Sequence, residues 1–369
     1  MLVYILFFLS ALSTFIISKK SYVYLAFILF YILFLILWGF RWDIGNDYQG
    51  LIILNQTNID DSVSRLREPF FYIVSEIDIY FDSKGFLLVF IYNFFTYSLL
   101  FTIFKDSKNK KYFLYFLITS GFVFWANDQV RQALAFVVYL YFLSLLCKYE
   151  DLPWKRSLKL IFIGGLLSTS VHFSFALILI ATLLVFISIK FNLIKFNIIL
   201  PVLALFINNF LSTESVFSFI VYLISYLPGD AVDRFLFNPE FYSNDGIKSR
   251  GITLYIFTGI FYLLLFSNRK NSTIVYKFFI ALISIYLSFY IIFFDFFLLK
   301  RLFSIGLYLY FLILPSHYIL NRGSWHMVPI SSFVNLGFIF LLFLIFLSYI
   351  VTEGGRHGGI PYNSLLQYY

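Results

Sequence analysis

The stretch WANDQVRQALAFVVYLYFLSLLC, residues 125–147, decides the fold because a long apolar run directly follows two charged side chains. The run over 132–147 predicts a membrane-spanning helix. Asp128 and Arg131 stand at its entrance, and charge within the apolar layer of a bilayer costs free energy. We therefore interpret Arg131 as a functional residue.

The composition places the rest of the chain in a membrane as well. Of the 369 residues, 61% are hydrophobic and only 12% are charged, and the mean hydropathy is +0.87. Such a chain cannot cover itself with a polar surface, so lipid must be its solvent. We expect an all-α, polytopic integral membrane protein that forms a single transmembrane domain over residues 1–369.

Apolar runs set the expected crossings. A helix needs about 20 residues to cross a bilayer, and about 12 runs approach this length, several of them short. The expected spans are 2–18, 22–40, 84–104, 112–125, 132–147, 159–171, 173–189, 196–212, 251–267, 278–294, 302–320 and 329–351.

Basic residues set the expected orientation. They gather in the short turns after alternate spans, for example at Lys155, Arg156 and Lys159. Short basic loops stay in the cytoplasm, so the net charge of +8 predicts orientation rather than nucleic-acid binding. The outer side then holds the long segments 41–83 and 213–250 and the tail 352–369, where we expect function to lie.

Several kinds of chemistry have no support in the sequence. The one cysteine excludes an internal disulfide and multi-cysteine metal motifs, and the four histidines form no HExxH pair. No Walker loop is present, so nucleotide hydrolysis is not the energy source. We expect no metal and no cofactor, and any reaction must use an activated substrate or a gradient.

Polar motifs mark the first outer segment. RWDIGNDYQG (41–50) is typical of a structured loop, and RLREPFF (65–71) places Arg67 and Glu68 directly before Pro69. Proline suits the first turn of a helix, here one that lies along the membrane interface. The alternative interpretation is that both motifs are solvated loops with a capping role.

His172 and Arg301 stand at further breaks between apolar runs. His172 lies among hydroxyl side chains between two short spans, and imidazole exchanges a proton near neutral pH, although a lone histidine is more often structural. Arg301 opens a span as Arg131 does. Two guanidiniums at helix starts form a receptor for a diphosphate.

The order of these motifs resembles the EpsG-type branch of the Wzy polymerases, which polymerise bacterial O-antigen or exopolysaccharide repeat units. Each motif is short, but the resemblance covers nearly the whole chain. It rests on GNDY at 45–48, REP at 67–69, NDQVRQALA at 127–135, HFS at 172–174, KRLFSIGLYLYFLILP at 300–315 and IPY at 360–362.

The resemblance implies a polymerase at the periplasmic face of the bacterial inner membrane. A growing glycan on undecaprenyl diphosphate would pass to the terminal sugar of a new lipid-linked repeat unit. A chain-length regulator and a flippase are the protein partners to expect, and nucleic acid is not.

The expected site residues follow from that reaction. Arg131 and Arg301 would bind the leaving diphosphate, with Arg67 and Arg250 as additions. The base would be His172, or else the carboxylate of Asp47 or Glu68 if its pKa is raised. The remaining residues would orient sugars (Gln132, Asn127 and Tyr48) or position an arginine (Asp128).

Two other functions remain open from the sequence. A lipid-linked glycan flippase or transporter would also bury charge, but such folds tend to show mirrored halves and broken helices, and neither is visible. A membrane acyltransferase acting on surface polysaccharide would use a histidine on a sugar hydroxyl, with its donor arriving from the cytoplasm. A glycan ligase would share the polymerase chemistry.

Overall fold

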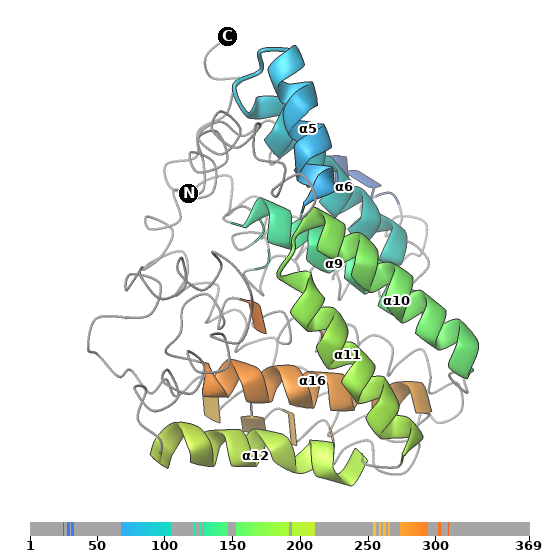
Figure 1. Cartoon of the computed structure of the whole chain (residues 1–369), viewed down its shortest axis with the longest axis vertical. Helices are drawn as coiled ribbons and strands as arrows, with labels where there is room; N and C mark the ends of the chain where they lie inside the picture. Colours follow the sequence, from blue (N-terminus) through green and yellow to red (C-terminus); the bar gives the residue numbers. More distant parts are fainter. Residues whose placement is uncertain are drawn as a thin grey trace, which may run out of the picture. The chain divides into compact units, whose positions relative to one another are not determined.

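The computed structural model describes residues 68–104, 129–146, 153–191, 194–210 and 274–293, together with single positions elsewhere in the chain. Within these ranges every regular element is a helix (Figure 1). The helices are α5 (Pro69–Tyr80), α6 (Phe86–Phe104), α9 (Val130–Leu146), α10 (Trp154–Val171), α11 (Phe175–Lys190), α12 (Ile194–Phe210) and α16 (Ile274–Ile292).

The chain divides into two compact units, and the helices near Glu68 belong to the first. Residues 1–180 and 314–369 form one unit, and residues 181–313 form the other. The single domain expected from the sequence stays a prediction.

The apolar runs predicted helices well wherever the structure describes them. The expected spans 84–104, 132–147, 159–171, 173–189, 196–212 and 278–294 coincide with α6, α9, α10, α11, α12 and α16. The helix expected to begin at Pro69 is α5. The remaining spans and the two outer segments lie wholly or largely outside the described residues.

The start of α10 differs from the expectation. The helix begins at Trp154, directly after Pro153, so Lys155, Arg156 and Lys159 lie on its first turns rather than in a turn between spans. All three basic side chains are exposed there. A helix can extend beyond its apolar run because long basic side chains reach solvent without ending it.

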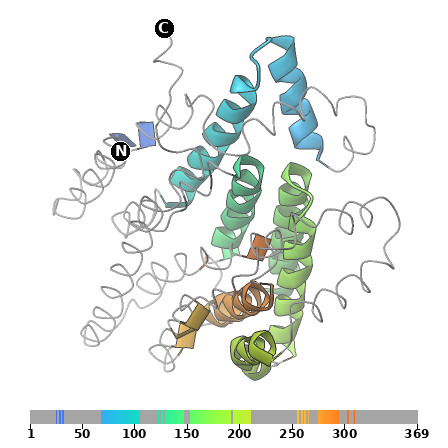
Figure 2. The same cartoon turned by 90° about the vertical axis from the view of Figure 1, so that its left-hand side faces the viewer.

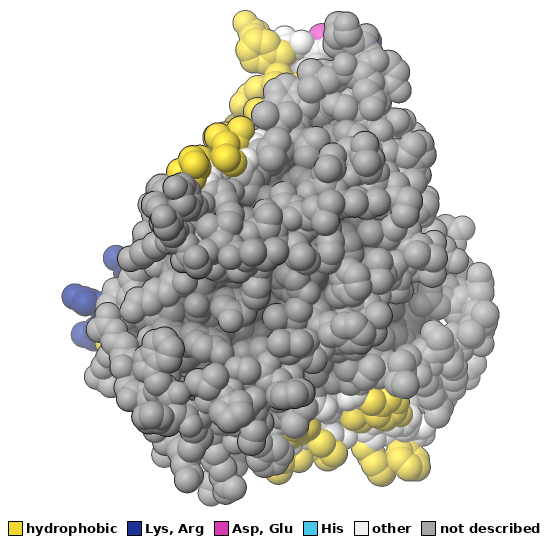
Figure 3. All heavy atoms as spheres, turned by 180° about the vertical axis from the view of Figure 1, so that it is seen from behind, with side chains coloured by type: hydrophobic (Ala, Val, Ile, Leu, Met, Phe, Trp, Pro, Cys, Tyr) yellow, Lys and Arg dark blue, Asp and Glu magenta, His cyan; other side chains and the backbone are white. Residues whose placement is uncertain are grey.

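Apolar surface is abundant on the described helices. Exposed side chains include Ile73 in α5, Phe94 in α6, Leu166 in α10 and Leu184 in α11, and Figure 3 shows hydrophobic side chains at the surface of one face. Among the described residues, Phe86–Ile103 is the helical segment that is long and apolar enough to cross a membrane, and α9 and α11 are shorter apolar helices. The full set of about 12 crossings expected from the sequence stays a prediction.

A buried carboxylate joins α5 to α6. Asp78 accepts hydrogen bonds from the backbone N–H groups of Gly85 (2.7 Å) and Leu88 (3.1 Å) and from the Ser83 hydroxyl. These N–H groups lie at the start of α6, where a helix has no backbone partners of its own. Gly85 adopts a φ of 86°, which glycine accepts without steric cost. The connection therefore fixes the angle between the two helices.

Two adjacent glycines bring α10 close to its neighbours. A Cβ atom at Gly164 would lie 2.6 Å from Cβ of Phe142 in α9, and one at Gly165 would overlap Leu179 of α11. Small residues at such contacts let membrane helices approach closely. α9 packs against both α6 and α10, and α9 and α10 lie side by side in Figures 1 and 2.

In the second unit, α12 packs against α16 around a proline. Pro201 lies inside α12 and has no N–H for the carbonyl of Asn197. The Ser284 hydroxyl of α16 donates to that carbonyl instead. Near the end of α12, the Asn208 side chain donates to the carbonyl of Ile291 at 2.7 Å. Side chains of neighbouring helices commonly satisfy a carbonyl that a proline has freed within a membrane.

Candidate functional site

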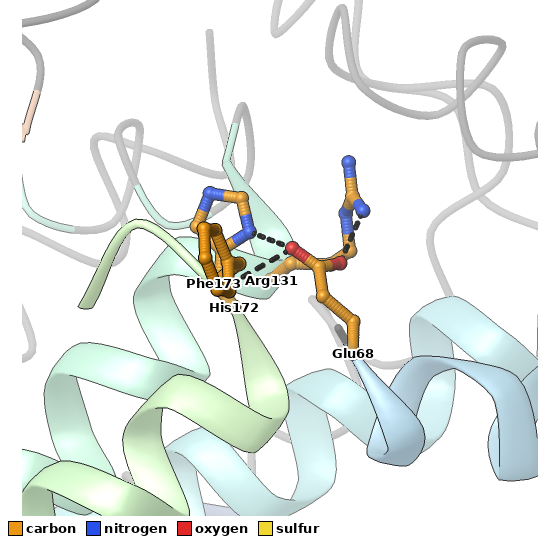
Figure 4. A network of polar contacts seen from close by, with 4 residues as sticks. All are labelled: Glu68, Arg131, His172 and Phe173. Carbon is orange, nitrogen blue, oxygen red and sulfur yellow. Dashed lines mark hydrogen bonds and ion pairs between the residues drawn. The ribbon is translucent and has the colours of Figure 1, made fainter. Parts of the chain in front are cut away.

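Glu68 is the centre of a polar network that joins three separate segments of the chain (Figure 4). Its Oε2 accepts a hydrogen bond from Nη1 of Arg131 at 2.7 Å. Its Oε1 contacts Nδ1 of His172 at 2.6 Å and accepts a third bond from the backbone N–H of Phe173 at 3.0 Å. One carboxylate thus holds a guanidinium on one oxygen and an imidazole on the other.

Each member of the network occupies the end of a helix. Glu68 is the N-cap of α5 and makes no side-chain cap bond, Arg131 lies in the first turn of α9, and His172 is the C-cap of α10. Pro69 starts α5 because its fixed φ suits the first helical position. The site therefore forms where helices begin and end, within the first compact unit.

The backbone at His172 leaves the helix. Its φ of −151° and ψ of 116° are extended, although its N–H still bonds the carbonyl of Ser168 at 2.9 Å. The change of direction turns the N–H of Phe173 away from the helix and toward the Glu68 carboxylate. The same break thus supplies both the imidazole and a backbone donor.

The network keeps Glu68 ionised. The side chains of Arg131, His172 and Glu68 are only 21%, 18% and 14% exposed. Burial alone would raise the pKa of the Glu68 carboxyl, but the His172 hydrogen bond, the charge of Arg131 and the Phe173 N–H together lower this pKa to about 2. Because an ionised carboxylate only accepts hydrogen bonds, the proton of the Glu68–His172 contact lies on Nδ1.

An aromatic ring lies under the arginine. The Cζ atom of Arg131 is 5.0 Å from the centroid of the Phe71 ring, within the range of a cation–π interaction. The buried Nε of Arg131 has no hydrogen-bond partner, and neither has Oε1 of Gln132 or Oγ of Ser174, within the described part of the chain. Buried polar atoms are usually paired, so these three atoms are exceptions to a general rule.

The structure brings together three of the residues predicted from the sequence, Glu68, Arg131 and His172, with Gln132 next to the arginine in α9. The other predicted residues lie outside the described residues: Asp47, Tyr48, Arg67, Asn127, Asp128, Arg250 and Arg301. The convergence of Arg131 with Arg301 therefore stays a prediction.

The expectation that Glu68 is the base needs correction. A carboxylate base requires a raised pKa, whereas the pKa of Glu68 is lowered and both of its oxygens are engaged. The carboxylate that pairs with Arg131 within the described ranges is Glu68. Asp128, which the sequence suggested as a partner for an arginine, lies outside those ranges, and its role stays a prediction.

Sequence reasoning missed Phe71 and the N–H of Phe173. Phe71 is the N3 residue of the helix that Glu68 precedes as N-cap, and side chains at these two positions can lie close together, so the spacing held a usable signal. A backbone donor leaves no signal in the sequence. Among the described residues, no group of three or more His, Cys, Asp or Glu side chains is placed to hold a metal ion.

Comparison with known proteins places the chain in a family. The comparison with curated proteins and the comparison with solved structures gave no match. The model of the EpsG family matches residues 23–364, which include Glu68, Arg131 and His172. The matched region is most of the chain, and the protein belongs to the EpsG family.

Proposed function

We propose that the protein polymerises oligosaccharide repeat units linked to undecaprenyl diphosphate, transferring the growing glycan to the terminal sugar of a new lipid-linked unit. EpsG family membership supports a role of the membrane polysaccharide-polymerase type. The observation that carries the finer proposal is the Glu68 carboxylate, which holds an imidazole and a guanidinium in one site. The reaction takes place at the periplasmic face of the bacterial inner membrane.

His172 is the proposed base. Its Nδ1 is engaged with Glu68, so Nε2 carries the lone pair that accepts the proton of the acceptor sugar hydroxyl. The ionised Glu68 fixes the orientation of the ring and stabilises the imidazolium that forms, as the carboxylate does in catalytic triads. In Figure 4 the ring nitrogen that is not bonded to Glu68 points away from the carboxylate. Glu68 thus positions the base, and Asp47 remains the alternative base.

Arg131 is the proposed diphosphate ligand. As the acceptor oxygen bonds to the anomeric carbon of the donor, the bond from that carbon to the phosphate oxygen breaks, and the electron pair leaves with undecaprenyl diphosphate. A diphosphate leaving group needs positive charge more than a proton. Arg131 supplies that charge while Glu68 holds its Nη1 at 2.7 Å.

The remaining site residues extend the same scheme. Arg301, Arg67 and Arg250 would add positive charge at the diphosphate. Gln132, Asn127 and Tyr48 would orient the sugars, and Asp128 would position an arginine. A chain-length regulator and a flippase would act beside the polymerase.

Glycan analysis of a strain that lacks the protein tests the proposal. The expected result is surface glycan with a single repeat unit in place of a ladder, restored to a ladder by the wild-type gene. An absence of even the single unit at the surface would indicate a flippase instead. A full ladder that lacks acyl groups would indicate an acyltransferase.

A further inference from the structure

Two adjacent rings at the start of α5 face different neighbours. The Phe70 ring packs edge-on against Tyr92 and Phe95 of α6, with centroid distances of 5.3 Å and 6.1 Å. The Phe71 ring instead lies under the guanidinium of Arg131 in α9. Successive side chains on a helix point about 100° apart, which separates a packing ring from a ring at the charged site.

Phe71 and Glu68 hold the same guanidinium from the start of one helix. Glu68 is the N-cap of α5 and Phe71 is its N3 residue, and side chains at these two positions can lie close together. The Glu68 carboxylate accepts from Nη1 at 2.7 Å, and the Phe71 ring lies 5.0 Å from Cζ. The carboxylate alone fixes one nitrogen but lets the guanidinium plane turn about that bond. The ring restricts the turn because the cation is attracted to the ring face.

The plane of the guanidinium decides what it can bind. Its N–H donors lie in one plane, and a bidentate contact to phosphate forms only when that plane is aligned with the ligand. Nε is buried and Nη1 is engaged with Glu68, so Nη2 is the nitrogen at which a new anion would be met. In Figure 4 the terminal guanidinium nitrogen that is not bonded to Glu68 points away from the carboxylate.

We propose that Phe71 is a positioning residue, which holds the Arg131 plane so that Nη2 meets the diphosphate of the lipid-linked donor. This inference rests on the proposed function and adds a residue to it. The ring itself does not touch the reacting atoms. Its effect passes through the arginine.

Binding of farnesyl diphosphate to the purified full-length protein in detergent, measured by titration calorimetry, tests this role. F71L keeps an apolar side chain but removes the ring, and F71Y keeps the ring. F70L is the matched control, because it removes the ring that packs against α6. We expect F71L to weaken binding about 5- to 30-fold. F71Y and F70L should bind as the wild type does. Size-exclusion profiles check that each variant is folded.

A double-mutant cycle separates positioning from general destabilisation. If the ring acts through the guanidinium, F71L should add nothing to the loss caused by R131A. Wild-type binding by F71L, equal losses in F71L and F71Y, or additive losses with R131A would each overturn the role of Phe71. If R131A loses binding and F71L does not, the Phe71 inference fails alone. If R131A binds normally, the proposed diphosphate role of Arg131 fails and the inference fails with it.

Discussion

The two ends of α5 each carry a carboxylate, buried at Asp78 and part-buried at Glu68, and their partners differ in kind. Asp78, near the C-terminal end, accepts from the Ser83 hydroxyl and from the backbone N–H groups of Gly85 and Leu88, which are at most 10 residues away. Glu68, at the N-terminal end, binds the side chains of Arg131 and His172, which are 63 and 104 residues away.

The difference separates a structural carboxylate from a functional one. Backbone N–H groups neither titrate nor leave the helix start, so these bonds give Asp78 a capping role at α6. The Arg131 guanidinium carries a charge and an imidazole such as that of His172 can exchange a proton, and both side chains retain nitrogen atoms that Glu68 does not engage. Burial alone would have ranked Asp78, at 1% exposure, as the more notable residue. The partners of a buried carboxylate are the better guide to its role.

The largest effect is expected for H172A. Removal of a general base costs about 10²- to 10⁴-fold in rate, so the glycan ladder should collapse to single units. The amount of the variant in the membrane, measured by immunoblot, should match the wild type. The cap of α10 at residue 172 is made by its backbone N–H, which alanine keeps. A wild-type ladder from H172A would move the base to Asp47 and leave Glu68 without a catalytic partner.

R131A should cost slightly less, about 10²- to 10³-fold in transfer rate, as is typical when one group that stabilises a developing charge is removed. R131K should recover little of this loss because an ammonium cannot reproduce the guanidinium fork. Transfer is measured as lipid-linked polymer formed by purified protein. Full activity in R131K would show that only point charge matters at this position.

The matched pair E68Q and D78N tests the comparison itself. E68Q should lower the transfer rate by more than about tenfold, because a neutral amide no longer stabilises the imidazolium or holds the ring tautomer. D78N should leave the rate unchanged and reduce stability by about 1–3 kcal/mol, since its NH₂ group would face N–H donors. Thermal unfolding in detergent and the transfer assay report the two effects. If E68Q and D78N changed the transfer rate and the thermal stability to the same extent, the two carboxylates would not differ in role.

A further effect is expected in the pH dependence of stability. The pKa of Glu68 is lowered from 4.5 in the unfolded chain to about 2 in the folded protein. A lowered pKa stabilises the folded state fully above the unfolded value, and this contribution is lost as pH falls from 4.5 toward 2. The contribution is on the order of 3 kcal/mol. The difference in the free energy of unfolding between wild type and E68Q should therefore decrease as the pH falls from 4.5 toward 2. A difference that does not change with pH would argue against the ionised network.

Local signals in the sequence predicted much of the described fold. Continuous apolar runs indicated α6, α9 and α16 because such runs fill a bilayer-facing helix. Pro69 indicated the start of α5 because proline suits a position where no N–H is needed. The early start of α10 was missed because an apolar window cannot detect a helical turn made of basic residues.

The site was predicted residue by residue but not as a network. Arg131 and His172 stood out because charged and titratable groups are costly near apolar runs. Their shared contact with Glu68 depends on how α5, α9 and α10 pack. Glu68 and His172 are 104 residues apart in the sequence, so no local pattern indicates that they meet. Asp78 was missed for another reason. In the sequence, a buried acidic residue near the end of a helix cannot be distinguished from one on the solvent-exposed face.

The central claim is that Glu68 and His172 act as one unit in the transfer. It is tested most directly by the rate of undecaprenyl diphosphate release from a lipid-linked repeat unit by purified wild type, E68Q, H172Q and the double variant. The account predicts that the loss in E68Q/H172Q is far smaller than the product of the two single losses, because the residues are coupled. A loss equal to that product would show that the two side chains act independently and would contradict the account.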